Sequence, residues 1–269
     1  MEQTALCKPQ SIDNLMGLFD LFKKGKNDLG KQEQVEGNLL ENTAGSNGKL
    51  IIIKQQKLAD GSFYSGEATP CANGFYLPNG FGKKIVNEDL ELTGCWKDGN
   101  INGVCYKNMH HSMITGHFIK NQPQGWCLSI GKGQGADFGV FKKEKCVRSL
   151  VETVSWMLKS IDYDIKFKPN KRMVFVGNIM GLFEGDKDYI ARGFHFMNNG
   201  EIYVGMDTSQ FEQTGFFFKF TQDGHIQIGL FEHGALEMEL EPKEVIQNCF
   251  HDYDPTWLSL TIDTNKKYF

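Results

Sequence analysis

Residues 92–103 read LTGCWKDGNING, with a bulky residue two positions before the first glycine and a tryptophan two positions after it. The same rhythm, in which an aromatic or β-branched residue usually precedes a glycine by two positions, recurs at six other places. The seven units begin near Tyr64, Leu92, Ile114, Asp137, Phe175, Tyr203 and Gln227. A chain built from such units is expected to stack supersecondary elements of one kind.

The spacing of the central glycines supports a true period. From Gly94 to Gly116 is 22 residues, from Gly116 to Gly139 is 23, and from Gly205 to Gly229 is 24. A fixed period in this range marks a stacked-repeat architecture, which usually supplies a binding surface and not an active site.

Turn dipeptides stand at one constant offset before three of the units. They are Asp60-Gly61, Asn199-Gly200 and Asp223-Gly224, which precede Tyr64, Tyr203 and Gln227. Asp-Gly and Asn-Gly favour type I′ turns, in which both central residues take positive φ. Each unit is therefore predicted to be a strand, a tight turn and a strand.

A further glycine follows the central glycine by nine or ten residues in three units. These glycines are Gly103, Gly125 and Gly215. We expect a second turn at these positions, which returns the chain for the next hairpin. Because one hairpin cannot bury its apolar face alone, neighbouring hairpins must stack into a continuous sheet.

This pattern resembles the MORN (membrane occupation and recognition nexus) repeat family, whose unit runs roughly Tyr-x-Gly-x-Trp-x-x-Gly-x-x-x-Gly-x-Gly. Residues 92–103 match best, while Cys105 stands where the last glycine is expected. In the unit at 114–125, Asn121 replaces the middle glycine. The resemblance covers roughly residues 50 to 240, with degenerate copies. The repeat-defining residues are Tyr64, Gly66, Gly94, Trp96, Gly99, Gly103, Gly116, Phe118, Gly125, Gly139, Phe141, Gly177, Tyr203, Gly205, Gly229, Phe231 and Gly234.

The predicted fold is mainly β: an elongated antiparallel stack of MORN-like β-hairpin repeats, with short helical segments at the termini. A central insertion is either a further helical segment or a strand. One face of the twisted sheet is expected to be closed by its own aromatics and the other left for partners. The expected parts are 1–48, an N-terminal amphipathic helix and polar loop; 49–145, a first block of hairpins; 146–172, an insertion; 173–240, a second block; and 241–269, a helix and aromatic tail.

Composition agrees with a folded chain. Of 269 residues 40% are hydrophobic, 21 are phenylalanine and only seven are proline. The net charge of −4 gives no general attraction to nucleic acid. Seven cysteines without a CxxC pair favour reduced thiols in an intracellular compartment, and those at 95, 105 and 127 are expected to be small core residues. No apolar run is long enough to span a membrane.

Both ends of the chain carry candidate docking segments. Residues 11–24 predict an amphipathic helix, which caps the first repeat, docks on a partner or lies on a membrane. Asp13 and Asp20 on its polar face favour the first two roles. After a short helix predicted over 242–250, aromatic residues need burial against the last repeat or against a partner. The partner-docking candidates are Ile12, Leu15, Met16, Phe19, Phe22, Tyr253 and Trp257.

The insertion leaves two secondary structures open. Leu150, Val154 and Leu158 fit helical spacing, but they also fit the alternation of a strand together with Trp156. Pro169-Asn170 indicates a further hairpin between two apolar runs.

Charge is distributed unevenly along the chain. Between residues 142 and 172 nine basic residues face four acidic ones, whereas between 223 and 254 eight acidic residues face one basic residue. Such segments are either solvated faces or surfaces that steer a partner of opposite charge. The candidates for contact with an anionic surface are Lys142, Lys143, Lys145, Lys166, Lys168, Lys171 and Arg172.

The sequence carries no P-loop, nucleophile elbow or HExxH motif, and we expect no enzyme activity, no catalytic or metal-binding residue and no cofactor. The resemblance implies a non-catalytic scaffold subunit that docks within a larger intracellular protein assembly, cytoplasmic, cytoskeletal or ciliary. Its partners would be other protein subunits and not nucleic acid. The alternative is a peripheral membrane adaptor that binds anionic phospholipid through the basic middle segment.

Overall fold

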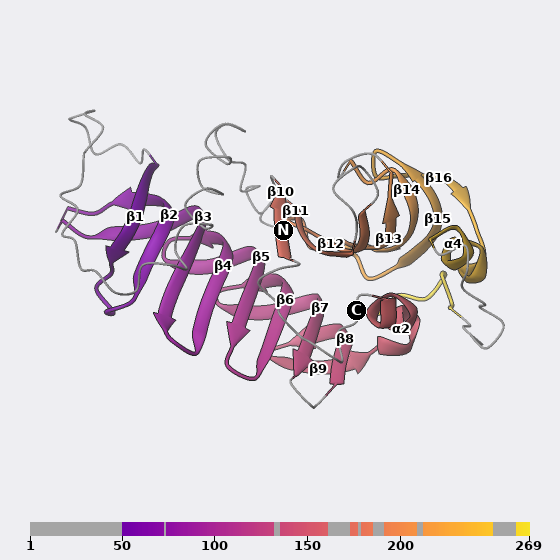
Figure 1. Cartoon of the computed structure of the whole chain (residues 1–269), viewed down its shortest axis with the longest axis horizontal. Helices are drawn as coiled ribbons and strands as arrows, with labels where there is room; N and C mark the ends of the chain where they lie inside the picture. The colour runs from indigo at the N-terminus through magenta and orange to yellow at the C-terminus, as the bar shows by residue number, and fades with distance from the viewer. Residues whose placement is uncertain are drawn as a thin grey trace.

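The computed structural model describes residues 50–72, 74–131, 135–160, 173–176, 179–184, 191–208, 212–249 and 262–269, without the side chains of 159–160 and 173–191. Within these ranges the chain forms two antiparallel sheets of nine and seven strands, in which every strand pairs with its neighbours in sequence (Figure 1). The prediction of a mainly β stack of antiparallel hairpins is confirmed.

The first sheet contains strands β1 to β9. Their bounds are β1 Ile51–Lys57, β2 Phe63–Pro70, β3 Tyr76–Asn87, β4 Leu90–Lys97, β5 Asn100–Met109, β6 Ser112–Ile119, β7 Gln122–Gly131, β8 Gly135–Lys142 and β9 Lys145–Ser149.

The second sheet contains strands β10 to β16. Their bounds are β10 Met173–Val176, β11 Ile179–Glu184, β12 Ala191–Met197, β13 Ile202–Asp207, β14 Gly215–Phe220, β15 Ile226–Glu232 and β16 Ala235–Glu239. Two helices accompany the sheets, α2 over Val151–Ser160 and α4 over Pro242–Cys249. No helix in the described part of the chain has the length and apolarity needed to cross a membrane.

Glycines of neighbouring strands lie opposite one another in the first sheet. We call this row the glycine line. It runs through Gly66, Gly82, Gly94, Cys105, Gly116, Cys127 and Gly139. In the second sheet it runs through Gly193, Gly205, Phe217 and Gly229. From β2 to β8 and from β13 to β15 each unit adds two strands and returns to the same line, because the period of the repeat equals one hairpin. The unit near Phe175 lies on β10, three strands before Tyr203 on β13, and is out of this phase.

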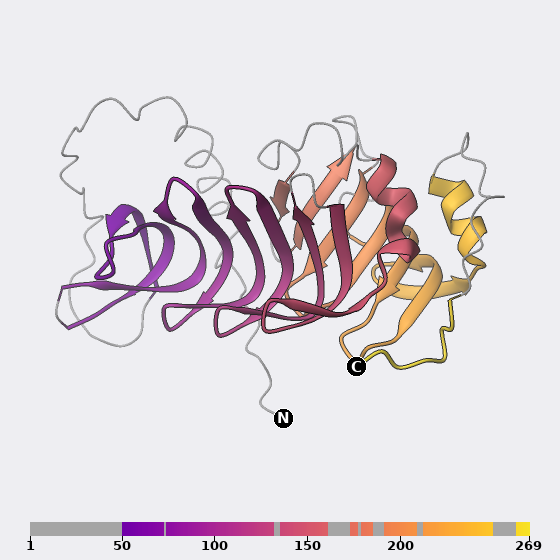
Figure 2. The ribbon, with the colours of Figure 1, turned by 90° about the horizontal axis from the view of Figure 1, so that it is seen from below.

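Close approach of the backbone explains why these positions are glycine. A methyl group on Gly94 would overlap the carbonyl oxygen of Val104 and lie 2.6 Å from the Cα of Cys105. At Gly205 it would overlap the carbonyl oxygen of Phe216. The strands of the first sheet curve strongly (Figure 2), and this curvature needs such contact between adjacent backbones.

The turn chemistry differs from the prediction. At the predicted dipeptides only the glycines have positive φ, +84° at Gly61, +90° at Gly200 and +92° at Gly224. Each of these turns repeats the same backbone hydrogen bonds, for example from the Gly224 N–H to the Thr221 carbonyl at 3.0 Å. A type I′ turn needs two central residues with positive φ, but each of these longer loops has only one, the glycine. The prediction of type I′ turns at these dipeptides was therefore wrong.

Two-residue turns with two positive φ angles occur instead at the other end of the hairpins. Asp98 and Gly99 have φ of 50° and 77°, and Lys120 and Asn121 have 49° and 70°. The middle glycine of the motif is therefore the second residue of a type I′ turn, a position where asparagine also tolerates positive φ. This explains why Asn121 can replace glycine.

The third glycines lie within strands and not in turns. Gly103 belongs to β5 and Gly125 to β7, and each accompanies a register shift, between Gly94 and Trp96 in the first case. The expectation of a second turn at these positions was wrong, because a β-bulge also demands the positive φ that glycine provides. The chain already returns four residues earlier in the first case, at Gly99.

Three apolar clusters fill the part of the molecule that the structure describes. The first inner core lies on one side of the first sheet and contains the repeat aromatics Tyr64, Trp96, Phe118 and Phe141. The second inner core consists of Tyr203, Phe217 and Phe231. A shared core joins residues of both sheets and both helices, among them Trp126, Phe138, Trp156, Phe220 and Val245.

The shared core changes the expectation that one face of the stack is left open. Phe138 and Phe220 approach edge to face with ring centroids 4.7 Å apart, so the two sheets pack against each other through this face. Over the shared core the face predicted to remain for partners is instead buried inside the chain.

The helices lie beside the shared core. The first sheet continues past the predicted end of the first block at 145, since β9 (Lys145–Ser149) takes up the start of the predicted insertion. The following residues form α2, which packs on β8, β12 and β13. The helical alternative for this segment is therefore the correct one. Helix α4 confirms the prediction at 242–250 and buries Val245, Ile246 and Cys249. The predicted helix at 11–24, the hairpin at Pro169-Asn170 and the docking candidates at both ends lie outside the described residues.

Candidate partner-binding surfaces

The repeat-defining residues that the structure describes form the interior and not a surface. Tyr64, Phe118 and Phe231 are fully buried, and Trp96, Phe141 and Tyr203 nearly so. The glycines shape the backbone, as described above, and Gly177 lies outside the described residues. The repeats therefore build the frame, and any contact with a partner must use other residues.

The seam between the sheets is held by polar contacts over long sequence distances. We use the term inter-sheet seam for Val104, Trp126, Asn198 and Thr221. The Val104 N–H donates to the side-chain oxygen of Asn198 at 3.1 Å, and this bond is buried. The two residues are 94 positions apart in the sequence. Val104 lies beside the β-bulge of β5, where the regular ladder is interrupted. The amide of Asn198 thus supplies an acceptor from the other sheet.

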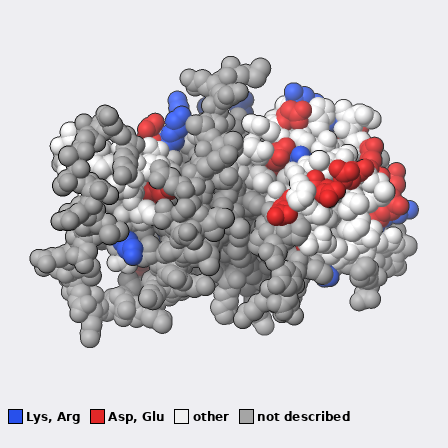
Figure 3. Space-filling view, turned by 90° about the horizontal axis from the view of Figure 1, so that it is seen from above, with Lys and Arg blue, Asp and Glu red and all other residues white. Residues whose placement is uncertain are grey.

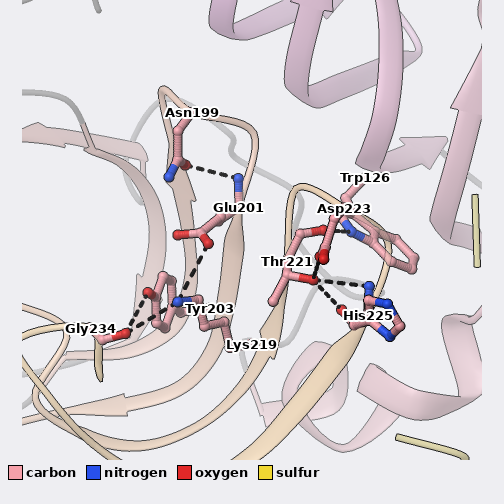
Figure 4. A network of polar contacts seen from close by, with 9 residues as sticks. All are labelled: Trp126, Asn199, Glu201, Tyr203, Lys219, Thr221, Asp223, His225 and Gly234. Carbon is pink, nitrogen blue, oxygen red and sulfur yellow. Dashed lines mark hydrogen bonds and ion pairs between the residues drawn. The ribbon is translucent and has the colours of Figure 1, made fainter. Parts of the chain in front are cut away.

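A second contact of the seam lies at the next hairpin. The indole Nε1 of Trp126 donates to the carbonyl of Thr221 at 2.8 Å. Figure 4 shows Trp126 reaching the turn of the second sheet that contains Thr221, Asp223 and His225. The Thr221 hydroxyl accepts from the His225 N–H at 2.9 Å, which fixes the turn that receives the indole.

Residues 262–269 close this seam from outside. The Tyr268 N–H donates to the carbonyl of Gly224 at 2.8 Å, and the Arg148 guanidinium donates to the carbonyl of Tyr268 at 3.1 Å. The same guanidinium lies 4.9 Å from the centroid of the Tyr268 ring, within the range of a cation–π contact. The rings of Trp126 and Phe269 meet edge to face at 5.1 Å. One segment therefore binds both sheets.

A neighbouring network lies on the second sheet, beside the second inner core. Figure 4 shows Lys219 between Glu201 and the carbonyl of Gly234, at 3.4 Å and 3.2 Å. The Tyr203 hydroxyl donates to the same carbonyl at 3.3 Å, and the Lys219 ammonium lies 5.2 Å from the Tyr203 ring centroid. Burial raises the pKa of the Tyr203 phenol, with a further contribution from Glu201. These contacts fix a β-turn and leave the phenol protonated.

A buried histidine and aspartate face each other within the second sheet. The Nδ1 atom of His195 lies 3.7 Å from a carboxylate oxygen of Asp207, and both side chains are fully buried. Burial lowers the pKa of His195 to about 4, against an opposing effect of Asp207. Asp207 also accepts from the Gln213 N–H at 3.2 Å. The pair lies inside the protein, and the protonation of His195 is therefore coupled to folding.

The cysteines behave as core residues. Cys95, Cys105 and Cys127 are buried, as predicted, and burial raises the pKa of the last two thiols far above the ordinary range. Burial also raises the pKa of Cys249 to about 12. In the described part of the chain, no group of three or more His, Cys, Asp or Glu residues is placed to bind a metal ion.

The basic candidates are only partly described. Lys142, Lys143 and Lys145 are exposed around the turn between β8 and β9, where Lys142 and Lys145 face each other in the ladder. Glu144 within this turn is paired with Lys107 at 2.5 Å. The other four candidates lie outside the described residues.

Acidic side chains gather on the second sheet. Figure 3 shows them spread over the half of the molecule in which this sheet lies. In the sequence they cluster from the end of β15 into α4, where the exposed acidic residues are Glu232, Glu237, Glu239, Glu241 and Glu244. The acidic end of the sequence thus forms a surface in the folded protein.

Two edge strands are exposed at opposite ends of the fold. All five residues of β16 are exposed, including Leu236 at 36% and Met238 at 56%. In β1 six of the seven residues are exposed or half-buried, and Ile52 is 42% exposed. Both β1 and β16 pair with only one other strand among those that the structure describes. Exposed edges with apolar side chains are the features of this fold that another chain can extend.

The sequence did not indicate Asn198, Arg148 or Tyr268. The partner of each lies 94 or more residues away or in the other sheet, where no local pattern records it. Gly82 and Gly193 were also missed, because they lie on the strands between the counted units. Each of them follows a bulky or charged residue in a strand. Following both strands of every hairpin, instead of one, would have found them.

No model of a known protein family matches this sequence. No curated protein matches it either. The resemblance to MORN repeats consequently remains a prediction from the motif residues.

Proposed function

We propose that this protein is a non-catalytic scaffold subunit that docks within a larger protein assembly inside the cell. The observation that carries the proposal is the edge strand β16, in which Leu236 and Met238 are exposed beside acidic residues. A partner that covers them would remove apolar surface from water and complete the sheet by main-chain hydrogen bonds. The resemblance to MORN repeats supports a docking role, in the cytoplasm or in a cytoskeletal or ciliary structure.

Isolation of the protein at its native abundance tests this function. A tagged copy is purified, separated by size exclusion and analysed by mass spectrometry. We expect other proteins to co-elute in fixed ratio, and we expect Leu236→Asp with Met238→Asp to release them. Val147→Asp is the matched control, since Val147 is 60% exposed on β9. Elution without any other protein, for the unmodified chain, contradicts the proposal.

A second candidate function is that of a peripheral membrane adaptor. It is favoured by the three exposed lysines around the β8–β9 turn, where the acidic Glu144 is already paired with Lys107. Lysines near an anionic membrane surface contribute about 1 kcal/mol each. Flotation with vesicles of phosphatidylserine and phosphoinositide tests it. Reversal of Lys142, Lys143 and Lys145 to glutamate should abolish binding, and equal binding by that variant contradicts this function.

A further inference from the structure

We propose that this protein assembles head to tail, with the edge strand β16 of one copy placed against the edge strand β1 of the next. The proposal concerns copies of this chain alone. It therefore goes beyond the scaffold function and does not depend on it. Both use the β16 edge, so the β16 of any one copy pairs either with the next copy or with a different protein. Three observations support it: the exposure of both edges, their opposite charge and their positions in the molecule.

The β16 edge is acidic. Glu237 and Glu239 are exposed within the strand, and Glu232 and Glu241 are exposed on either side of it. Helix α4, which follows, packs on the face made by β13, β14 and β15. Within Ala235–Glu239 there is no basic residue that would neutralise the carboxylates.

The β1 edge is basic. Lys54 and Lys57 are exposed, and the strand contains no acidic residue. The nearest acidic residue after it, Asp60, is paired with Lys84 at 2.6 Å, and this contact lowers the pKa of Asp60 to about 2. The exposed Ile52 gives the edge an apolar side chain, as Leu236 and Met238 do on β16.

The two edges lie far apart in one molecule. Figures 1 and 2 show β1 and β16 at opposite ends of the long axis. They therefore cannot meet within one copy, but they can meet between copies. Pairing of two different surfaces is heterologous, so each added copy leaves one free β1 and one free β16. The expected product is an open chain of copies and not a closed dimer.

Charge favours this pairing over the pairing of two like edges. Two β16 edges would place glutamates against glutamates, and two β1 edges would place lysines against lysines. Like charges opposite one another destabilise a pair of strands, whereas opposite charges stabilise it. Each strand is also short and irregular, with a register shift after Ile53 and another between Leu230 and Phe231. The contact is consequently weak, concentration-dependent and sensitive to salt.

Sedimentation of the purified full-length chain over a range of concentrations tests the proposal. The average mass should rise with concentration at low salt and fall towards that of one copy near 1 M salt, where the screening length is about 3 Å. Reversal of one edge, by Lys54→Glu with Lys57→Glu or by Glu237→Lys with Glu239→Lys, should weaken the association by about tenfold or more.

The decisive measurement combines the two reversals. A chain that carries all four substitutions again has opposite charges at its two ends, so it should regain the association that each reversal loses. Lys142→Glu with Lys145→Glu is the matched control, because it makes the same charge change at another edge, and it should leave the association unchanged. These outcomes cannot arise from misfolding, since the most heavily substituted chain recovers.

Several results would overturn the proposal. One is a single-copy mass at every concentration and salt level. Another is a four-fold substituted chain that remains as dissociated as the variants with one reversed edge. A loss of association in the control at Lys142 and Lys145, with no loss on reversal of β1, would assign the contact to β9 instead.

Discussion

The indole Nε1 of Trp126 lies 2.8 Å from the carbonyl oxygen of Thr221, and this hydrogen bond joins β7 to the turn between β14 and β15. The turn that accepts this bond also accepts a hydrogen bond from the Tyr268 N–H at the Gly224 carbonyl. These hydrogen bonds join the two sheets into one structural unit.

Trp126→Phe should preserve an aromatic ring in the shared core but remove the donor. We expect a loss of about 1–2 kcal/mol in the free energy of unfolding, because the hydrogen bond from the indole to the Thr221 carbonyl is lost and only the Gly224 N–H still donates to that carbonyl. Hydrogen exchange should accelerate at the amides of His225 and Tyr268. Trp96→Phe is the control, since its indole donates to Gly82 within the first sheet at 3.0 Å. Faster exchange of the same amides in the control would contradict a specific role for Trp126.

Asn198→Ala should leave the buried N–H of Val104 without the oxygen that the second sheet supplies. The expected loss of stability is about 1–3 kcal/mol, the usual cost of an unsatisfied buried group. Asn199→Ala is a close control. The Asn199 side chain accepts only within its own turn, from the Glu201 N–H at 3.0 Å. Urea denaturation of both variants measures the difference, and equal losses would show that the seam contact adds nothing.

Gly94→Ala should be strongly destabilising, because its methyl group would overlap the backbone of Val104. We expect more than about 3 kcal/mol, beyond the ordinary cost of a core substitution. Gly61→Ala separates this effect from backbone strain. Its φ is +84°, but no atom lies within 4 Å of the added methyl group, so about 1 kcal/mol is expected. Thermal denaturation that ranks Gly61→Ala as the more damaging change would refute the role of the glycine line.

Stability should fall as the pH is lowered from about 6.5 to about 4. His195 is buried in its neutral form with a pKa of about 4, whereas in the unfolded chain it takes up a proton near pH 6.5. The unfolded state therefore binds more protons in this window, and the slope approaches about 1.4 kcal/mol per pH unit for one such group. Burial also lowers the pKa of His117, which adds a contribution of the same sign.

His195→Asn should reduce this slope, as measured from unfolding free energies at several pH values. His111→Asn should leave it unchanged, because that imidazole is exposed. A slope that His195→Asn does not alter would mean that other groups account for the acid sensitivity.

The sequence predicts the frame of this protein well. The period of the glycines depends on contacts between neighbouring strands, which are close in sequence, so it records the strand pairs from β2 to β8 and from β13 to β15 but not the step from β10 to β13. Each unit begins on a strand of the structure, from Tyr64 in β2 to Gln227 in β15. The turn types were harder to assign, because one glycine serves a type I′ turn, a longer turn or a bulge, and all three demand positive φ.

The packing of the two sheets was not predictable from the same signals. Residues that face the shared core, such as Trp126 and Phe220, alternate with residues that face the inner cores, and both sets are apolar. A local pattern then indicates that a strand is buried on both faces, but it does not indicate which part of the chain covers each face. The partner of Trp126 is fixed by the three-dimensional path of the chain, and a single sequence carries no record of that path.

Within each sheet, the strands that the structure describes pair only with their neighbours in sequence, and this has a consequence for the order of folding. Each hairpin closes a short loop, whereas the bonds of Val104 to Asn198 and of Trp126 to Thr221 span 94 and 95 residues. The entropy cost of closing a loop grows only with the logarithm of its length, and local contacts form fastest. Formation of each sheet can therefore start at any of its hairpins and proceed strand by strand. Docking of the two completed sheets becomes the late step on which the folding rate depends.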